Sequence, residues 1–193
     1  MLHLVNYFRM SKEKQIEAHV AEIMKILGLD VDNPAIKDTP KRVAKMYVEE
    51  LFVGLHIEPP KITTFPNEGY DQMVMVRDIQ FYSVCEHHLV PIVGKATVAY
   101  LPQEKVIGLS KINRVVNHFA AKPQLQERLT TEIAKFLEEK LDTENVAVVI
   151  SAEHYCCKMR GVRDSSSDTV TSYFGGAFRS QELRAEFLNL SKK

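Results

Sequence analysis

The chain has 193 residues, and its 25 Lys plus Arg balance its 25 Asp plus Glu, so the formal net charge is zero. That balance excludes an overall basic field, and no apolar run approaches the roughly 20 residues of a membrane span. We therefore expect neither nucleic acid nor a membrane as a partner. Hydrophobic residues make up 45%, which is enough for a core. Three cysteines, two of them adjacent, form a poor disulfide framework and favour a reducing compartment, so we expect a soluble, cytoplasmic protein.

Two helices are predicted at the N-terminal end. Apolar residues recur with helical spacing over residues 11–27. A second helix starts with Thr39 as its N-cap and Pro40 at its first position, where the missing N–H costs nothing, and ends before Gly54. Residues 56–70 are rich in proline and should be irregular. We therefore expect an N-terminal helical region and linker over residues 1–70, followed by a main domain over residues 71–193.

The main domain has the predicted order ββααββ. Its strands and helices are expected at residues 73–84, 92–101, 110–119, 124–141, 145–153 and 170–178, with a closing helix at 180–190. This order predicts an α+β fold, an antiparallel sheet with two helices on one face. Such a sheet leaves its other face and its edges bare, which favours self-association into a ring. A monomeric mass in solution would contradict that hypothesis.

Candidate metal ligands lie in two places. Cys85 and His88 stand in the connection between the first two strands, and Cys156 and Cys157 follow the third strand. The first and third strands can be neighbours in an antiparallel sheet, so these strand ends are expected to converge. Cys85, His88 and one of the two later thiols would give a Cys₂His set with an open fourth position, the arrangement of a catalytic zinc site. Zinc bound in this way supplies hydroxide near neutral pH.

Two histidines remain beside this predicted site. His87 and His154 are candidates for proton transfer, because imidazole titrates near neutral pH. Composition does not decide between Cys156 and Cys157. If the third strand continued, alternation would place His154 and Cys156 on one side and Cys157 on the other.

Anion-binding residues form a third group. Ser110, Lys111 and Arg114 lie at a predicted helix N-terminus, where backbone N–H groups and the helix dipole favour phosphate. Arg160 follows the second half of the metal site, and we expect these cations to cluster near it. A solvated basic face is the alternative interpretation. Glu127 alone would ordinarily be an exposed helix carboxylate.

Several ordered motifs together resemble one family. They are TPKRVAKMY at 39–47, CEHHLVP at 85–91, GLSKINR at 108–114, PQLQERLT at 123–130 and HYCCKMRGVRD at 154–164. In these motifs the sequence is similar to GTP cyclohydrolase I. The resemblance implies a zinc hydrolase that converts GTP to 7,8-dihydroneopterin triphosphate and formate, the entry to folate or pterin biosynthesis. It also implies the tunnelling fold, assembled as a toroidal homodecamer of two pentamers.

The resemblance further implies roles for individual residues. The family's zinc ligands fall on Cys85, His88 and Cys156, and Cys157 is not a family ligand position. The remaining implied roles are N7 protonation for His154, further proton transfer for His87, guanine binding for Glu127, a contact near the sugar for Ser110, triphosphate binding for Lys111, Arg114 and Arg160, and a contribution from a neighbouring subunit for Arg42. Glu86 is given no role, and the sequence does not say whether a regulatory partner exists.

Two other functions remain open at this point. Another tunnelling-fold enzyme, such as a pyruvoyl-tetrahydropterin synthase-like lyase, would bind zinc with three histidines. A non-catalytic, zinc-stabilised interaction module would need four protein ligands.

Overall fold

The computed structural model describes residues 11–192 and divides into two compact units, one ending at Val53 and the other starting at Gly54. Residues 56–70, which the sequence suggested as a linker, therefore count with the second unit. The reason is that β1 (Thr64–Pro66) pairs antiparallel with β4 (Lys105–Ile107). Within residues 11–192, no helix is long and apolar enough to cross a membrane.

The first unit begins with helix α2 (Lys12–Ile26). The Ser11 side chain caps it by accepting from the backbone N–H of Lys14, and Gly28 follows with a φ of 80°. A left-handed residue just past the last turn is typical of a helix end, and glycine adopts it without steric cost. The predicted helix over residues 11–27 is confirmed.

The second predicted helix has three parts, the last of which crosses the boundary between the units. An α-helix, α3 (Thr39–Met46), continues into a π-helical turn, Tyr47–Leu51, and a 3₁₀ turn, Val53–Leu55. The prediction that Thr39 is the N-cap is wrong by one residue. The N-cap is Asp38, and its side chain makes no capping hydrogen bond because its backbone is already helical, with φ −90° and ψ −2°.

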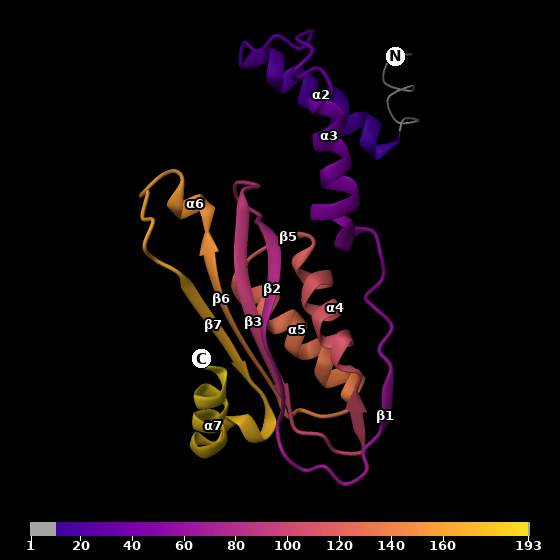
Figure 1. Ribbon diagram of the computed structural model, residues 1–193, viewed down its shortest axis with the longest axis vertical. Coiled ribbons are helices and arrows are strands. Elements are labelled where there is room, and N and C mark those ends of the chain that lie inside the picture. The colour runs from indigo at the N-terminus through magenta and orange to yellow at the C-terminus, as the bar shows by residue number, and fades with distance from the viewer. Residues whose placement is uncertain (1–10, 193) are drawn as a thin grey trace. The chain divides into compact units, whose positions relative to one another are not determined.

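The second unit is built on a sheet of five strands within residues 11–192, in the order β5-β2-β3-β6-β7 (Figure 1). The bounds are β2 Val74–Cys85, β3 Pro91–Tyr100, β5 Pro123–Gln124, β6 Val146–His154 and β7 Thr169–Phe174. All pairs are antiparallel except β2 with the two-residue β5, which is parallel. The expectation that the first and third long strands are neighbours is wrong, because β3 lies between β2 and β6.

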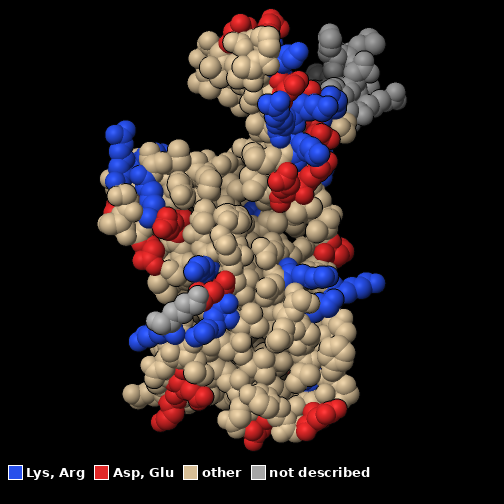
Figure 2. Space-filling view, viewed as in Figure 1, with Lys and Arg blue, Asp and Glu red and all other residues tan. Residues whose placement is uncertain are grey.

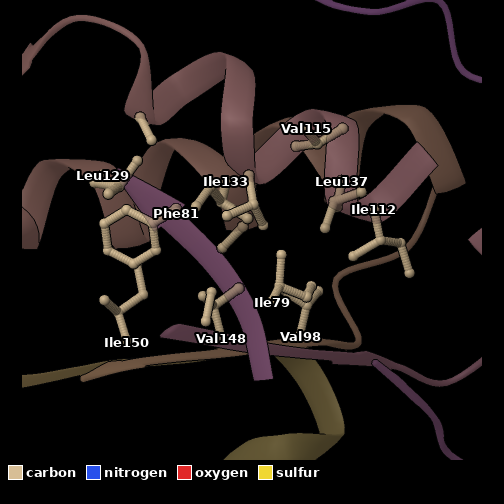
Figure 3. Close-up of a cluster of buried hydrophobic side chains, with 14 of the residues drawn as sticks. Ile79, Phe81, Val98, Ile112, Val115, Leu129, Ile133, Leu137, Val148 and Ile150 are labelled. Carbon is tan, nitrogen blue, oxygen red and sulfur yellow. The ribbon is translucent and has the colours of Figure 1, made fainter. Parts of the chain in front are cut away.

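Two helices cover one face of this sheet, as predicted. α4 (Leu109–Ala120) and α5 (Gln126–Leu141) pack their apolar sides onto inward-facing strand residues. Figure 3 shows this layer, with labelled side chains Ile79, Phe81, Val98, Ile112, Val115, Leu129, Ile133, Leu137, Val148 and Ile150. Strand alternation alone places β3 residues of this cluster on the core face.

The other face is partly covered, which the sequence analysis did not foresee. After the 3₁₀ turn Gly176–Arg179, helix α7 (Gln181–Ser191) folds back against this face (Figure 1). Phe187 of α7 and Phe178 form a second buried cluster with Ala99 and Ala147 of the sheet. The small alanine side chains leave room for the two rings.

The antiparallel pairing gives the second unit two distinct ends. At one, which we call the turn end, Val84 pairs with Pro91; at the other, the Tyr100 end, Val74 pairs with Tyr100. The ten residues of β3 separate these ends by about 30 Å, at roughly 3.3 Å per residue. The helix α4 starts at the Tyr100 end, where the backbone N–H of Ile107 donates to the Tyr100 hydroxyl at 3.0 Å.

Candidate metal centre and active site

A tight turn after β2 brings two candidate ligands together. The backbone N–H groups of Leu89 and Cys85 donate to the carbonyls of Cys85 and Val90, each at 2.8 Å, and Leu89 takes a φ of 52°. This closure folds His88 back over the strand end. The His88 Nδ1 lies 3.9 Å from the Cys85 Sγ. Cys85 is buried and His88 is exposed, so the pair opens toward solvent on one side.

The third candidate ligand arrives from the end of β6. Ligand atoms of Cys85, His88 and Cys156 all lie within 4.8 Å of one another. The alternation argument that favoured Cys156 rested on a wrong premise, because the strand stops at His154 and a four-residue helical turn, α6 (Tyr155–Lys158), follows. That helical turn, rather than a strand, points the Cys156 thiol at the turn end.

The donor set suits a soft divalent cation. Burial, followed by the hydrogen bond and charge of Cys85 and then those of Cys157, raises the pKa of Cys156 to about 11. Thiolates gathered in this way repel one another unless a cation lies between them. Two sulfurs and one imidazole nitrogen are ligands that zinc prefers, and three protein ligands leave a fourth position open.

His154 is held by a buried amide that the sequence analysis missed. The Gln126 Oε1 lies 2.6 Å from the His154 Nε2. The amide cannot be turned around, because its Nε2 lies at 2.8–3.1 Å from three acceptors, two of them backbone carbonyls. The Oε1 must therefore accept, so the proton of neutral His154 lies on Nε2 and its Nδ1 is a free acceptor. The only sequence signal was the position of Gln126 beside Glu127 in a recognised motif.

The environment of His154 keeps it neutral. Burial lowers the pKa of His154, and the charge of Glu127 opposes that shift in part. Glu127, in the first turn of α5, therefore acts on the imidazole from the same end of the sheet. A neutral imidazole with one defined free nitrogen is ready to accept or relay a proton near neutral pH.

The residue without an assigned role, Glu86, forms an ion pair with Arg128 of α5. Its other carboxylate oxygen lies 3.9 Å from the His87 Nε2. Arg128 also donates to the Gln124 side chain at 3.3 Å, which connects the turn to the short strand β5. These contacts tie the turn to α5 and place a negative charge beside His87, which is otherwise exposed.

Basic residues rim the metal group on the side of α6. Figure 2 shows Lys and Arg gathered over α6 and the loop that follows it. Arg160 reaches back across the turn, with its Nη1 2.9 Å from the His88 Nε2. The ammonium of Lys158 forms an ion pair with Glu153 at 3.2 Å and donates to the Ser165 carbonyl at 2.8 Å. Arg160 is therefore the predicted anion ligand that the structure brings to the metal group.

The other predicted phosphate ligands lie elsewhere. Ser110, Lys111 and Arg114 are on the first two turns of α4, at the Tyr100 end. The expectation that they cluster near the metal group is wrong within one chain, because α4 runs from the Tyr100 end toward the turn end. The C-terminal end of α4 is the one near the turn end. There, just after the helix, the carbonyl of Lys122 accepts from the hydroxyl of Ser83 on β2 at 3.3 Å. Arg42 lies in the first unit and is exposed. Its guanidinium Nη2 is 3.8 Å from the Asp38 carboxylate.

Comparisons with known proteins agree on one family. The family model described as GTP cyclohydrolase I matches residues 16–192. A protein named GTP cyclohydrolase 1 from Edwardsiella ictaluri (strain 93-146) is 55% identical over 183 residues, which cover 93% of this chain and 83% of that protein. One of the same name from Shewanella sp. (strain ANA-3) is 52% identical over 193 residues, covering 98% and 89%. A solved archaeosine synthase QueF-Like structure matches with a TM-score of 0.43 and 13% identity, over 55% of this chain and 94% of that one, too distant to inform the site.

Proposed function

This chain belongs to the GTP cyclohydrolase I family and is an enzyme of that type, and from this premise we propose that it converts GTP to 7,8-dihydroneopterin triphosphate and formate with a zinc cofactor. The observation that carries the proposal is the convergence at the turn end. There, Cys85, His88 and Cys156 lie beside the neutral His154 and the cation Arg160.

In the proposed site Cys85, His88 and Cys156 hold the metal. Zinc held there would lower the pKa of a bound water to about 7 and so would supply hydroxide for hydrolysis at the purine C8 and of the resulting formamide. The burial of Cys85 favours retention of the ion, and the exposure of His88 leaves an approach for the base. Thiol ligands require a reducing compartment, which supports a cytoplasmic location.

His154 and His87 are the proposed proton carriers. Gln126 fixes the proton of neutral His154 on Nε2, so the proton passed to the purine N7 moves through Nδ1. His87 lies on the same turn as Cys85 and His88, with a carboxylate oxygen of Glu86 3.9 Å from its Nε2. We propose that His87 serves the later steps, in which the ribose rearranges and the ring recloses.

Substrate recognition divides between chains in this proposal. The Glu127 carboxylate accepts from two N–H groups of the guanine. Arg160 of the same chain binds the triphosphate. Lys111, Arg114 and Ser110 would come from a neighbouring chain, since they lie in the first two turns of α4, which starts at the Tyr100 end, away from their own chain's metal group. Arg42 is the proposed contribution of a neighbouring N-terminal unit. This division supports a tunnelling-fold ring, the toroidal homodecamer, over an active monomer.

The test is incubation with GTP. We expect formate in equal amount to a pterin that becomes fluorescent after oxidation, and we expect both to disappear after chelation and return with zinc. A native mass should show ten chains. A lyase of the pyruvoyl-tetrahydropterin synthase type would leave GTP unchanged, and the two thiols in the ligand group already favour the hydrolase over a three-histidine site. A purely structural zinc module would bind the metal without forming either product.

A further inference from the structure

A third thiol lies beside the metal group and has no part in the proposed reaction. The Sγ of Cys157 is 3.9 Å from the Sγ of Cys156, the two side chains projecting from adjacent residues of the turn α6. Cys157 does not belong to the group whose ligand atoms lie within 4.8 Å of one another, which consists of Cys85, His88 and Cys156. It is exposed, whereas Cys156 is half-buried.

The separation of the two sulfurs matches that of two ligands on one metal ion. Thiolates bound to a tetrahedral zinc at about 2.3 Å lie about 3.8 Å from each other. The observed 3.9 Å is close to that value, so Cys156 and Cys157 can hold a zinc-class ion as they stand, without any movement of the backbone. Cys156 is then common to two ligand groups, an outer pair with Cys157 and the inner set with Cys85 and His88.

The three thiols form a series from solvent to interior. Cys157 is exposed, Cys156 is half-buried, and Cys85 is only 5% exposed. The guanidinium of Arg160, at 2.9 Å from the His88 Nε2, stands over the imidazole and opposes the direct approach of a cation from that side. An ion that arrives from solvent on the side of α6 therefore meets Cys157 before it reaches the thiols of Cys156 and Cys85.

We propose that Cys157 is an entry ligand for the metal: the outer pair captures a thiophilic divalent cation at the surface, and Cys156 carries it inward as Cys85 and His88 replace Cys157. This inference rests on the proposed metal site. An entry ligand speeds both loading and release, since the same path is used in each direction, and it leaves the final affinity unchanged. A resident fourth ligand would instead raise the affinity and close the open position.

The experiment measures metal exchange on the whole protein, stripped of metal by chelation and kept reduced. Zinc uptake is followed by stopped flow against a chromophoric zinc chelator, and release is followed with excess chelator. The variant is Cys157→Ser. The matched control is Met159→Leu, which removes an exposed, neutral sulfur from the same segment. We expect Cys157→Ser to slow uptake and release by the same factor, on the order of tenfold. Zinc stoichiometry and the equilibrium dissociation constant should stay the same, and Met159→Leu should match the wild type.

Each other outcome overturns the inference in a recognisable way. Equal exchange rates in Cys157→Ser and the wild type would show that Cys157 is a bystander. A weaker equilibrium affinity with an accelerated release would show that Cys157 is a resident ligand of the final site. In both cases the wild type still binds one zinc, and the proposed function stands. If the wild-type protein binds no zinc at all, the proposed metal site and this inference fail together.

Discussion

The two ends of the second unit are built for different tasks. The turn end combines three thiols, one of them buried, with a neutral imidazole that is held by the fixed amide of Gln126. The Tyr100 end presents Ser110, Lys111 and Arg114 on the surface of a helix start, without a thiol or an imidazole among them. One end is equipped for chemistry and the other for holding an anion. Neither end alone carries all the residues of the proposed site, and we therefore propose that the two ends act together across chains.

The largest expected effect comes from removing a metal ligand at the turn end. Cys156→Ser should abolish both bound zinc and GTP hydrolysis, because one of three ligands is lost and the two remaining ones cannot define the site. Metal analysis by mass spectrometry and the formate assay measure both. Cys157→Ser should retain near-stoichiometric zinc after equilibration. The reverse result would exchange the roles of the two thiols.

The next effect concerns proton transfer at the same end. His154→Ala should lower turnover by on the order of 10²- to 10⁴-fold, as expected for a lost general acid–base, with zinc content unchanged. Gln126→Ala should also lower turnover, by less, because the imidazole stays but its tautomer is no longer fixed. Zinc content and the pH dependence of kcat distinguish this effect from misfolding. Normal turnover in Gln126→Ala would remove the amide from the proposed mechanism.

The third prediction joins the two ends. Lys111→Ala should cost roughly 10- to 100-fold in kcat/KM, the value of one charged hydrogen bond to phosphate. Co-assembly of Lys111→Ala and His154→Ala chains should then restore part of the activity, because some sites would receive an intact turn end and an intact Tyr100 end from different chains. The control is each variant assembled alone. Mixed assemblies, verified by native mass, with no recovery would show that each chain supplies its own triphosphate ligands.

The smallest expected effect is on the ion pair of the turn. Glu86→Gln should change the free energy of unfolding by less than about 1 kcal/mol, because the side chains of Glu86 and Arg128 are 28% and 43% exposed and solvent screens them. Turnover should fall although the free energy of unfolding hardly changes, since His87 loses its neighbouring carboxylate. Denaturant unfolding and steady-state kinetics separate the two. A double variant, Glu86→Arg with Arg128→Glu, should recover stability while His87 remains without its negative partner.

The sequence predicted long helices and strands better than short ones. The long strands and helices were confirmed because their apolar spacing extends over eight or more residues, as in the core face of β3. The strands β1, β4 and β5 have two or three residues each and carry no periodicity. The four-residue α6 was missed for the same reason, so Cys156 was favoured through an incorrect strand argument.

Distance was harder to predict than residue type. The motifs correctly marked Cys85 and His88 as neighbours of Cys156, since strands that finish at the same end of a sheet bring their last residues close together. They gave no sign that Lys111 and Arg114 lie at the far end, because that depends on the direction of α4 along the sheet. In the proposed assembly, these motifs contribute residues to one site from different chains. Only the direction of α4 along the sheet shows that Lys111 and Arg114 lie at the opposite end from Cys85.

The amide of Gln126 makes an edge strand part of the proposed chemistry. Its nitrogen bonds to the carbonyl of Thr169 and the hydroxyl of Thr171 on β7, while its oxygen holds His154. If β7 detached from β6, the amide would lose two of its three acceptors, the Thr169 carbonyl and the Thr171 hydroxyl, and keep only the carbonyl of Ile150 on β6. Its hold on the imidazole would then weaken. We therefore expect local opening of one edge strand to slow proton transfer without unfolding the protein. Amide hydrogen exchange in β7 should accordingly slow when a ligand occupies the site, since a bound purine selects the closed state.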